Sequence, residues 1–243
     1  MKKNRILKII CITLLSIVIV IGAVFGVYVH DYYHMNRTAE KALKSTDTIT
    51  VKEEKDRTVF EPEKYDTGLV FYPGGKVEYQ AYAPLMQDYA KKGILCVLVK
   101  MPFNLAVFNT NKAEHVIDDY TKVKNWYIGG HSLGGSMAAL CASKNSDDFK
   151  GIIFLGSYTT KDLKNTNLKA VSLYGSEDQV LNRESYQKYH DNLPENTIEE
   201  ILIGGNHSQF GSYGHQDGDG TATISAEKQR EETVDYSMEI MGK

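Results

Sequence analysis

The sequence predicts an α/β domain, in which a mostly parallel central sheet is covered by helices on both faces. Short apolar runs alternate along the chain with segments whose apolar residues recur at helical spacing. Some of these runs, residues 94–102 among them, are apolar almost throughout, as is typical of strands buried on both faces. The chain has 243 residues, of which 42% are hydrophobic, enough for one sizeable core and an appendage.

The appendage lies at the N-terminus. Four basic residues occur within residues 1–8, and residues 9–29 then contain no charged side chain. A helix of that length spans about 31 Å, close to the hydrocarbon thickness of a bilayer. The positive charges predict a cytoplasmic tail at 1–8, a transmembrane anchor at 9–29 and an extracytoplasmic remainder. Secretion after cleavage of a signal peptide is the alternative, although the apolar run is longer than usual and no small-residue cleavage site follows it.

Charge and cysteine usage narrow the function classes. Without the four N-terminal cations, 24 of the 28 basic residues remain against 31 acidic ones, a net charge of −7. An acidic domain without a basic stripe is a poor candidate for nucleic-acid binding. The three cysteines, Cys11, Cys96 and Cys141, lack metal-ligand spacing and are expected to be free thiols in apolar surroundings.

Residues 30–47 are polar with a few aromatics and predict a stalk, and residues 48–243 form the expected α/β domain. Its strands are expected at 48–51, 57–60, 67–75, 94–102, 125–130, 149–156, 169–178 and 197–207. Its helices are expected at 80–93, 133–144, 182–192 and 223–241. Gly93 is a plausible cap for the first of these helices, and a proline ends the strand that follows it.

Ser132 lies between Gly130 and Gly134 in "GHSLG", where an expected strand passes into an expected helix. A G-x-S-x-G motif in that context is the nucleophile elbow of many hydrolases. The serine sits on a strained turn there, so that side chains at the two glycine positions would collide with the strand or the helix. We therefore expect Ser132 to be a nucleophile, with the helix N-terminus favouring negative charge beside it.

A serine nucleophile requires a general base, which we expect to be His207 because it directly follows the last strand. His190 lies on a helix before that strand, and His215 lies eight residues later in a glycine-rich loop. His131, adjacent to Ser132, is expected to point away from the hydroxyl and to fill space in the elbow.

The acid that orients the base is expected where the preceding strand ends, in "SLYGSEDQV". The pattern of a strand followed by Gly-x-x-Asp favours Asp178 as this acid. Glu177 is the second candidate and Asp162 a distant third. An oxyanion hole also needs two backbone N–H donors. Leu133, after the nucleophile, is expected to give one.

The second donor is expected from the glycine turn after the third strand. Gly75 is favoured there, with Gly74 and Lys76 as alternatives. The oxyanion turn, the serine, the acid and the histidine thus follow in the chain order that this chemistry requires.

From about Gly68 to its end the chain resembles the α/β-hydrolase superfamily, and more narrowly a bacterial branch related to dienelactone hydrolases. The resemblance rests on "FYPGGKVEYQAYAPL", "KMPFNLAVFN", "NWYIGGHSLGG", "YGSEDQV" and "GNHSQFGSYGHQDGDG". It implies a sheet of the eight-strand type and hydrolysis of an ester or related acyl bond through Ser132, Asp178 and His207. The short opening strands would leave that sheet with one strand fewer. Dienelactone hydrolases carry a cysteine nucleophile, so the resemblance does not extend to a lactone-specific activity.

The segment between two later strands, residues 156–168, is too short for a lid domain. The site is then expected to be open, or to be roofed only by residues 101–115. We expect the apolar side chains of that segment either to form an acyl pocket or to pack against the sheet: Met101, Phe103, Leu105 and Phe108. The "DGDG" loop at 217–220 lacks the glutamate and spacing of a calcium motif, so no metal is expected.

The sequence therefore predicts a membrane-anchored, extracytoplasmic serine hydrolase that cleaves a small-molecule ester through an acyl-enzyme and needs no cofactor. An acyltransferase using the same residues is one alternative. A non-catalytic binding protein on the same fold is another, and a peptidase is disfavoured because no further substrate-binding domain is apparent.

Overall fold

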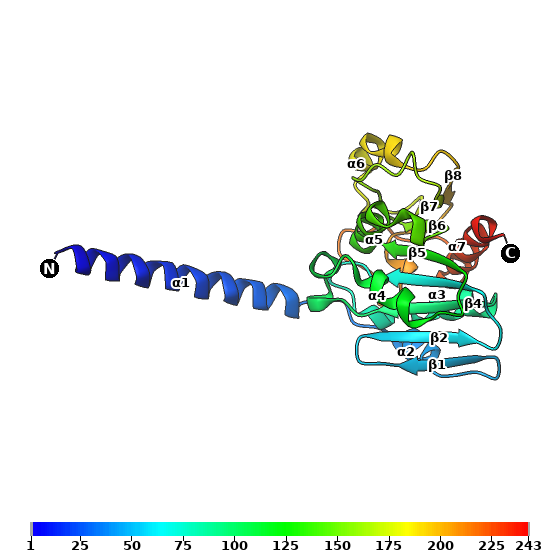
Figure 1. Ribbon diagram of the computed structural model, residues 1–243, viewed down its shortest axis with the longest axis horizontal. Helices are drawn as coiled ribbons and strands as arrows, with labels where there is room; N and C mark the ends of the chain where they lie inside the picture. The colour runs from blue at the N-terminus through cyan, green and yellow to red at the C-terminus, as the bar shows by residue number, and fades with distance from the viewer. Residues whose placement is uncertain (1, 243) are drawn as a thin grey trace. The chain divides into compact units, whose positions relative to one another are not determined.

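The computed structural model describes residues 2–242, and the chain divides after Tyr32 into two compact units. The first unit consists of helix α1 (Lys2–His30), which contains the expected anchor (Figure 1). From Asn4 to His30 it is long and apolar enough to cross a membrane, a test that a signal sequence also passes. Each unit is described by itself below.

The second unit, which begins at Tyr33, is built on one eight-stranded sheet. Its strands are β1 (Ile49–Glu53), β2 (Arg57–Pro62), β3 (Thr67–Tyr72), β4 (Ile94–Val99), β5 (Asn125–His131), β6 (Gly151–Leu155), β7 (Lys169–Gly175) and β8 (Thr197–Leu202). Their spatial order is β1-β2-β4-β3-β5-β6-β7-β8 (Figure 1). The first two strands are antiparallel to their neighbours and the other six are mutually parallel. The mostly parallel sheet is therefore confirmed. The expected loss of a strand was wrong, because both short opening strands pair.

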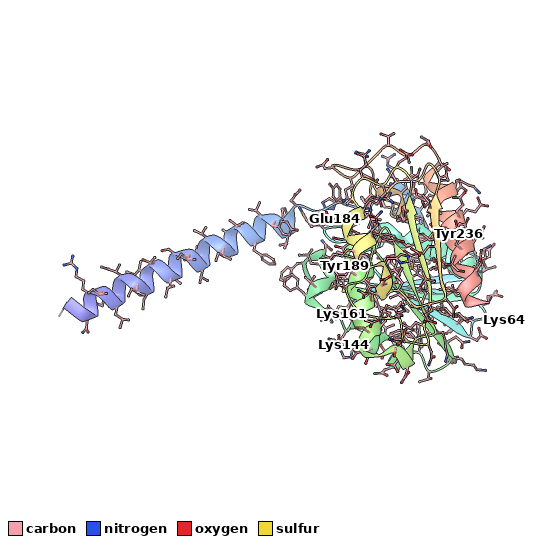
Figure 2. All side chains as sticks on the ribbon, turned by 90° about the horizontal axis from the view of Figure 1, so that it is seen from above. Lys64, Lys144, Lys161, Glu184, Tyr189 and Tyr236 are labelled. Atoms are coloured by element: carbon pink, nitrogen blue, oxygen red, sulfur yellow. The ribbon has the colours of Figure 1, made fainter. Side chains whose placement is uncertain are left out.

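Helices cover both faces of this sheet. They are α2 (Arg37–Ala42), α3 (Ala83–Lys91), α4 (Lys112–Asp119), α5 (Leu133–Lys144), α6 (Arg183–Lys188) and α7 (Ala226–Met241). Alternate residues of each strand point to opposite faces, so Leu69 and Phe71 of β3 join one apolar cluster with α3 and α7, and Val70 joins the other with α4 and α5. Charged side chains such as Lys64, Lys144 and Lys161 are exposed at the periphery (Figure 2).

Most of the expected stalk belongs to the second unit. Tyr33 pairs with Val77 as an isolated β-bridge, and Asn36 caps the N-terminus of α2. Ala39 and Ala42 of that helix are buried, and Ala42 lies in the cluster that contains α3. The compact unit therefore begins at Tyr33 rather than at residue 48.

The carboxyl ends of the parallel strands position the residues expected to carry the chemistry. Ser132 directly follows β5, Asp178 lies three residues after β7, and His207 lies five residues after β8. Residues 156–168, between β6 and β7, contain no helix or strand, in agreement with the expected lack of a cap domain. The site is thus built from loops at one edge of the sheet.

Candidate active site

Ser132 occupies a strained turn between β5 and α5. Its φ of 52° and ψ of −125° lie in a region that side-chain-bearing residues rarely adopt. A Cβ on Gly130 would lie 2.5 Å from the carbonyl carbon of Gly134. A Cβ on Gly134 would lie 2.3 Å from the carbonyl oxygens of Tyr72 and Pro73. Both elbow glycines are therefore needed where strand and helix meet, as their positions in the motif predict.

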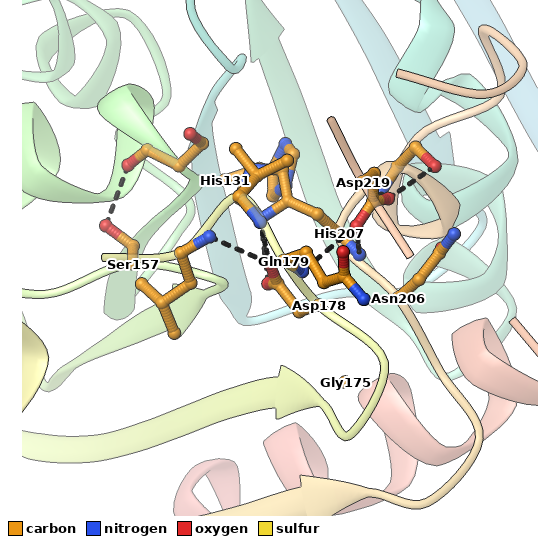
Figure 3. A network of polar contacts seen from close by, with 12 residues as sticks. His131, Ser157, Gly175, Asp178, Gln179, Asn206, His207 and Asp219 are labelled. Atoms are coloured by element: carbon orange, nitrogen blue, oxygen red, sulfur yellow. Dashed lines mark hydrogen bonds and ion pairs between the residues drawn. The ribbon is translucent and has the colours of Figure 1, made fainter. Parts of the chain in front are cut away.

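His207 and Asp178 form a buried hydrogen-bonded pair (Figure 3). The distance from His207 Nδ1 to Asp178 Oδ2 is 2.8 Å, and the two side chains are 1% and 0% exposed. Asp178 Oδ1 accepts hydrogen bonds from the backbone N–H groups of Val180 and Leu181 at 2.9 and 2.8 Å. Both carboxylate oxygens are thereby engaged, and this fixes the orientation of the acid.

The second ring nitrogen of His207 faces a different environment. Nε2 is buried and has no hydrogen-bond partner among the described residues. His207 and Ser132 line the same cavity. A general base of this kind needs a histidine that a carboxylate holds at Nδ1 while Nε2 is free to accept a proton, and His207 meets both requirements.

The other acids and histidines considered from the sequence make separate contacts. Glu177 accepts a hydrogen bond from Ser176 Oγ at 2.8 Å, and Asp162 accepts one from the N–H of Lys164. His190 lies 2.6 Å from a carboxylate oxygen of Glu199. His215 is exposed.

The ring of His131 lies against that of His207, a contact that the sequence did not predict. The buried ring of His131 lies with its centroid 4.3 Å from that of His207 (Figure 3). Burial lowers the pKa of His131 well below its ordinary value, and the neighbouring His207 lowers it further. His131 is therefore neutral, so that its Nδ1 can accept a hydrogen bond from Tyr82.

Tyr82 connects His131 to the glycine turn after β3. Its hydroxyl lies 2.7 Å from His131 Nδ1 and accepts a hydrogen bond from the N–H of Gly74 at 3.0 Å. Burial raises the pKa of Tyr82, so the hydroxyl keeps the proton that it donates to His131. Tyr82 lies 49 residues from His131. No motif spacing joins the two, so the sequence offered no signal for this contact.

The three candidate second donors of the oxyanion hole differ in their partners. Gly74 donates to Tyr82, and the N–H of Lys76 donates to the carbonyl oxygen of Asn104 at 2.9 Å. The N–H of Gly75 forms no hydrogen bond within the described part of the chain. Leu133 is the first residue of α5, and its N–H therefore has no intrahelical acceptor. A Cβ on Gly75 would lie 2.9 Å from Leu133 Cδ2, so the two expected donors lie on adjoining segments.

A cavity of about 240 Å³ adjoins Ser132 and His207. Its other lining residues are Leu133, Ser136, Gly156, Ser157, Tyr158, Val180, Leu181 and Asn182. The four residues of the expected apolar pocket lie elsewhere.

Two of those four, Met101 and Leu105, are buried, and Leu105 packs beside Gly75. Phe103 and Phe108 are 54% and 51% exposed, with ring centroids 5.5 Å apart. Residues 4–242, whose side chains are described, contain no cluster of three or more His, Cys, Asp or Glu that could hold a metal ion.

The strand order, the elbow and the chain order of the site residues are those of one hydrolase fold. A sequence model of the alpha/beta hydrolase family matches residues 68–231. The chain belongs to the α/β-hydrolase family. The matched part of this α/β hydrolase contains the glycine turn after β3, the elbow, Asp178 and His207.

Solved structures share the α/β-hydrolase fold at low sequence identity. A predicted CIB-like hydrolase from Thermoplasma acidophilum is 18% identical, with a TM-score of 0.55 over 78% of this chain and 98% of that chain. Est1E from Butyrivibrio proteoclasticus is 14% identical, with a TM-score of 0.58 over 81% of this chain and 100% of that one. TT1662 from Thermus thermophilus is 13% identical, with a TM-score of 0.53 over 66% and 91%. No curated protein matches the sequence significantly. The narrower resemblance to dienelactone hydrolases stays a prediction.

Proposed function

We propose that this α/β hydrolase is a serine hydrolase that cleaves a carboxylic ester, or a related acyl bond, through an acyl-enzyme on Ser132. One observation carries the proposal. His207 is held at Nδ1 by Asp178, its buried Nε2 has no partner in the described chain, and His207 lines the same cavity as Ser132.

The reaction follows from these contacts. His207 Nε2 accepts the proton of the Ser132 hydroxyl as Oγ attacks the ester carbonyl. The N–H groups of Gly75 and Leu133 stabilise the oxyanion, a contribution of about 10²–10³ in rate for each donor in comparable sites. His207 then returns the proton to the leaving alcohol. Water attacks the acyl-enzyme with His207 again as base, releasing the acid and restoring the serine.

The cavity beside Ser132 bears on the length of the acyl group that the enzyme accepts. It is small and partly polar, because Ser136, Ser157 and Asn182 contribute to its lining. If the acyl group occupies this cavity, hydrolysis of p-nitrophenyl acetate and butyrate should exceed that of the octanoate. If the group instead lies against Met101, Phe103, Leu105 and Phe108, the octanoate should be preferred.

Location forms part of the proposal. We place the catalytic unit on the extracytoplasmic side of the membrane, held by residues 9–29, because the basic residues precede the apolar run.

The first test is covalent labelling of the full-length protein, purified in detergent, with a fluorophosphonate probe. Intact mass should show one adduct in the wild type and none in Ser132→Ala. Ser143→Ala, at the end of the same helix, serves as the matched control and should label normally. No adduct on the folded wild type would contradict the serine-hydrolase proposal and favour a binding protein.

Transfer of the acyl group to an alcohol other than water uses the same residues and is the second candidate function. Product analysis in the presence of glycerol separates the two. Free acid alone supports hydrolysis, whereas glycerol ester in excess of acid supports transfer.

A further inference from the structure

The long loop between β8 and α7 contains a buried carboxylate that the proposed mechanism does not use. Asp219 is 8% exposed and forms no ion pair within the described chain. A buried carboxylate without a cation requires several hydrogen-bond donors to replace the water that it loses on burial. The contacts of Asp219 supply them.

Five donors converge on this carboxylate (Figure 3). Oδ2 accepts hydrogen bonds from the backbone N–H and the hydroxyl of Ser208, both at 2.8 Å. Oδ1 accepts from the N–H of Gly220 at 2.9 Å. The same oxygen also accepts from the N–H groups of Gln179 and His207, each at 3.3 Å. Only the Gly220 N–H is adjacent to Asp219 in sequence, so the other four donors come from other parts of the chain.

The last two donors belong to different loops. Gln179 directly follows the acid Asp178 in the loop after β7, and His207 is the base in the loop after β8. One oxygen atom of Asp219 therefore contacts the backbone beside the acid and the backbone of the base. The loops also pack tightly there, since a Cβ on Gly220 would lie 2.0 Å from the carbonyl oxygen of Glu177.

The side-chain amides of Asn206 and Gln229 also form hydrogen bonds with the backbone around His207 and Asp219. The Gln229 side chain accepts from the N–H of Asn206 at 3.0 Å and donates to the Asn206 carbonyl at 2.8 Å. The Asn206 side chain donates to the carbonyl of Gly220 at 2.8 Å. The residues before His207 and after Asp219 are thus tied to each other and to α7. Within this frame, Asp219 has a fixed position from which to hold both loops.

We propose that Asp219 is a positioning residue of the Asp178–His207 pair, which holds the two loops at the separation that their hydrogen bond requires. Its role in turnover rests on the proposed serine-hydrolase function. Its role in the geometry of the pair does not. The two roles are tested by separate measurements.

Asp219→Asn is the informative variant, because an amide of nearly the same shape keeps only one acceptor oxygen. In either orientation of the amide, its NH₂ group faces N–H groups that donate hydrogen bonds to the carboxylate in the wild type, so those hydrogen bonds are lost. With full-length protein in detergent and p-nitrophenyl acetate as substrate, kcat should fall on the order of 100-fold with little change in KM. Asp217→Asn makes the same chemical change at an exposed position of the same loop and should keep the wild-type kcat.

A spectroscopic measurement reports the pair without any substrate. The proton that His207 Nδ1 shares with Asp178 should give a far-downfield ¹H resonance, assigned by its loss in Asp178→Asn. We expect that resonance to shift or vanish in Asp219→Asn and to persist in Asp217→Asn. If the resonance behaves in this way but the wild-type protein hydrolyses no ester, the positioning role of Asp219 is supported and the proposed function is contradicted.

An unchanged resonance and an unchanged kcat in folded Asp219→Asn would overturn the proposal. If that variant does not fold, Ser208→Ala replaces it, since it removes one donor to Oδ2 and leaves the carboxylate in place. Its kcat should then fall by about 3- to 10-fold with KM retained. A wild-type kcat in Ser208→Ala, together with an unchanged resonance, would equally overturn the proposal.

Discussion

Tyr82 is the residue through which the glycine turn after β3 is tied to His131, the residue before Ser132. Its hydroxyl accepts a hydrogen bond from the N–H of Gly74, so that N–H is already engaged, whereas the next N–H, of Gly75, has no partner in the described chain. His131 completes the contact as the acceptor of the Tyr82 proton. If Gly75 is the second oxyanion donor, as we propose, the choice between Gly74 and Gly75 is made by a side chain outside the glycine turn.

Removal of the Tyr82 hydroxyl should affect the rate of turnover more than the binding of substrate. We expect Tyr82→Phe to lower kcat about 10-fold with KM retained, because the Gly75 N–H loses its fixed direction. It should also lower the free energy of unfolding by about 1–3 kcal/mol, since a buried donor and acceptor lose their partner. Tyr89→Phe is the matched control, for Tyr89 is fully buried and bonds Ser237 instead. Equal kcat values in the two variants would contradict this role.

His131 gives the folded state a dependence on pH. Its pKa is depressed in the folded protein, whereas the unfolded chain should titrate at about 6.5. Below that pH the unfolded state binds a proton that the folded state does not, so the free energy of unfolding should fall as the pH falls. The slope is at most about 1.4 kcal/mol per pH unit.

His131→Gln should remove this part of the slope. Urea titrations between pH 7 and pH 5, followed by the fluorescence of Trp126, report the second unit alone, because the chain has one tryptophan. Identical slopes for the variant and the wild type would show that His131 does not titrate in this way.

Helix α5 packs against the end of β3 so closely at Gly134 that this position admits no side chain. Gly134→Ala would place a methyl group 2.3 Å from two carbonyl oxygens, and backbone atoms cannot move aside as side chains do. We expect a loss of about 3 kcal/mol or more in the free energy of unfolding, together with loss of fluorophosphonate labelling. Ser143→Ala, in the last turn of α5, should change stability by less than about 0.5 kcal/mol. A Gly134→Ala protein of wild-type stability would show that strand and helix can separate.

The sheet and α5 were predictable because burial on both faces requires apolar runs and close approach requires glycine. The helix α4 was not, since among its residues only Ala113 and Val116 are buried. Residues 33–47 suggested a stalk for the same reason, because two alanines are too small a signal among polar residues.

Ser132, Asp178 and His207 could be proposed from sequence because each follows a strand end. Asp219 and Tyr82 could not, because their partners lie many residues away and no periodic pattern connects them. Their roles depend on which loops meet at the sheet edge, and that is a property of the folded chain.

The whole chain joins an apolar helix to a hydrolase unit. If α1 is an uncleaved anchor, the expressed protein should have the mass of all 243 residues and sediment with membranes. It should resist washing with high salt and dissolve in detergent, because the apolar helix rather than charge holds it. Soluble protein in the medium that lacks the first thirty or so residues would instead establish a cleaved signal sequence.

The backbone strain at Ser132 bears on how such a site can be lost during evolution. Neither alanine nor glycine at position 132 supplies a hydroxyl, but glycine adopts a φ of 52° at little cost, whereas alanine retains the strain of about 1–3 kcal/mol. A lineage that no longer needed the reaction could therefore replace the serine by glycine without harm to folding. Persistence of serine at this position would reflect selection for chemistry alone.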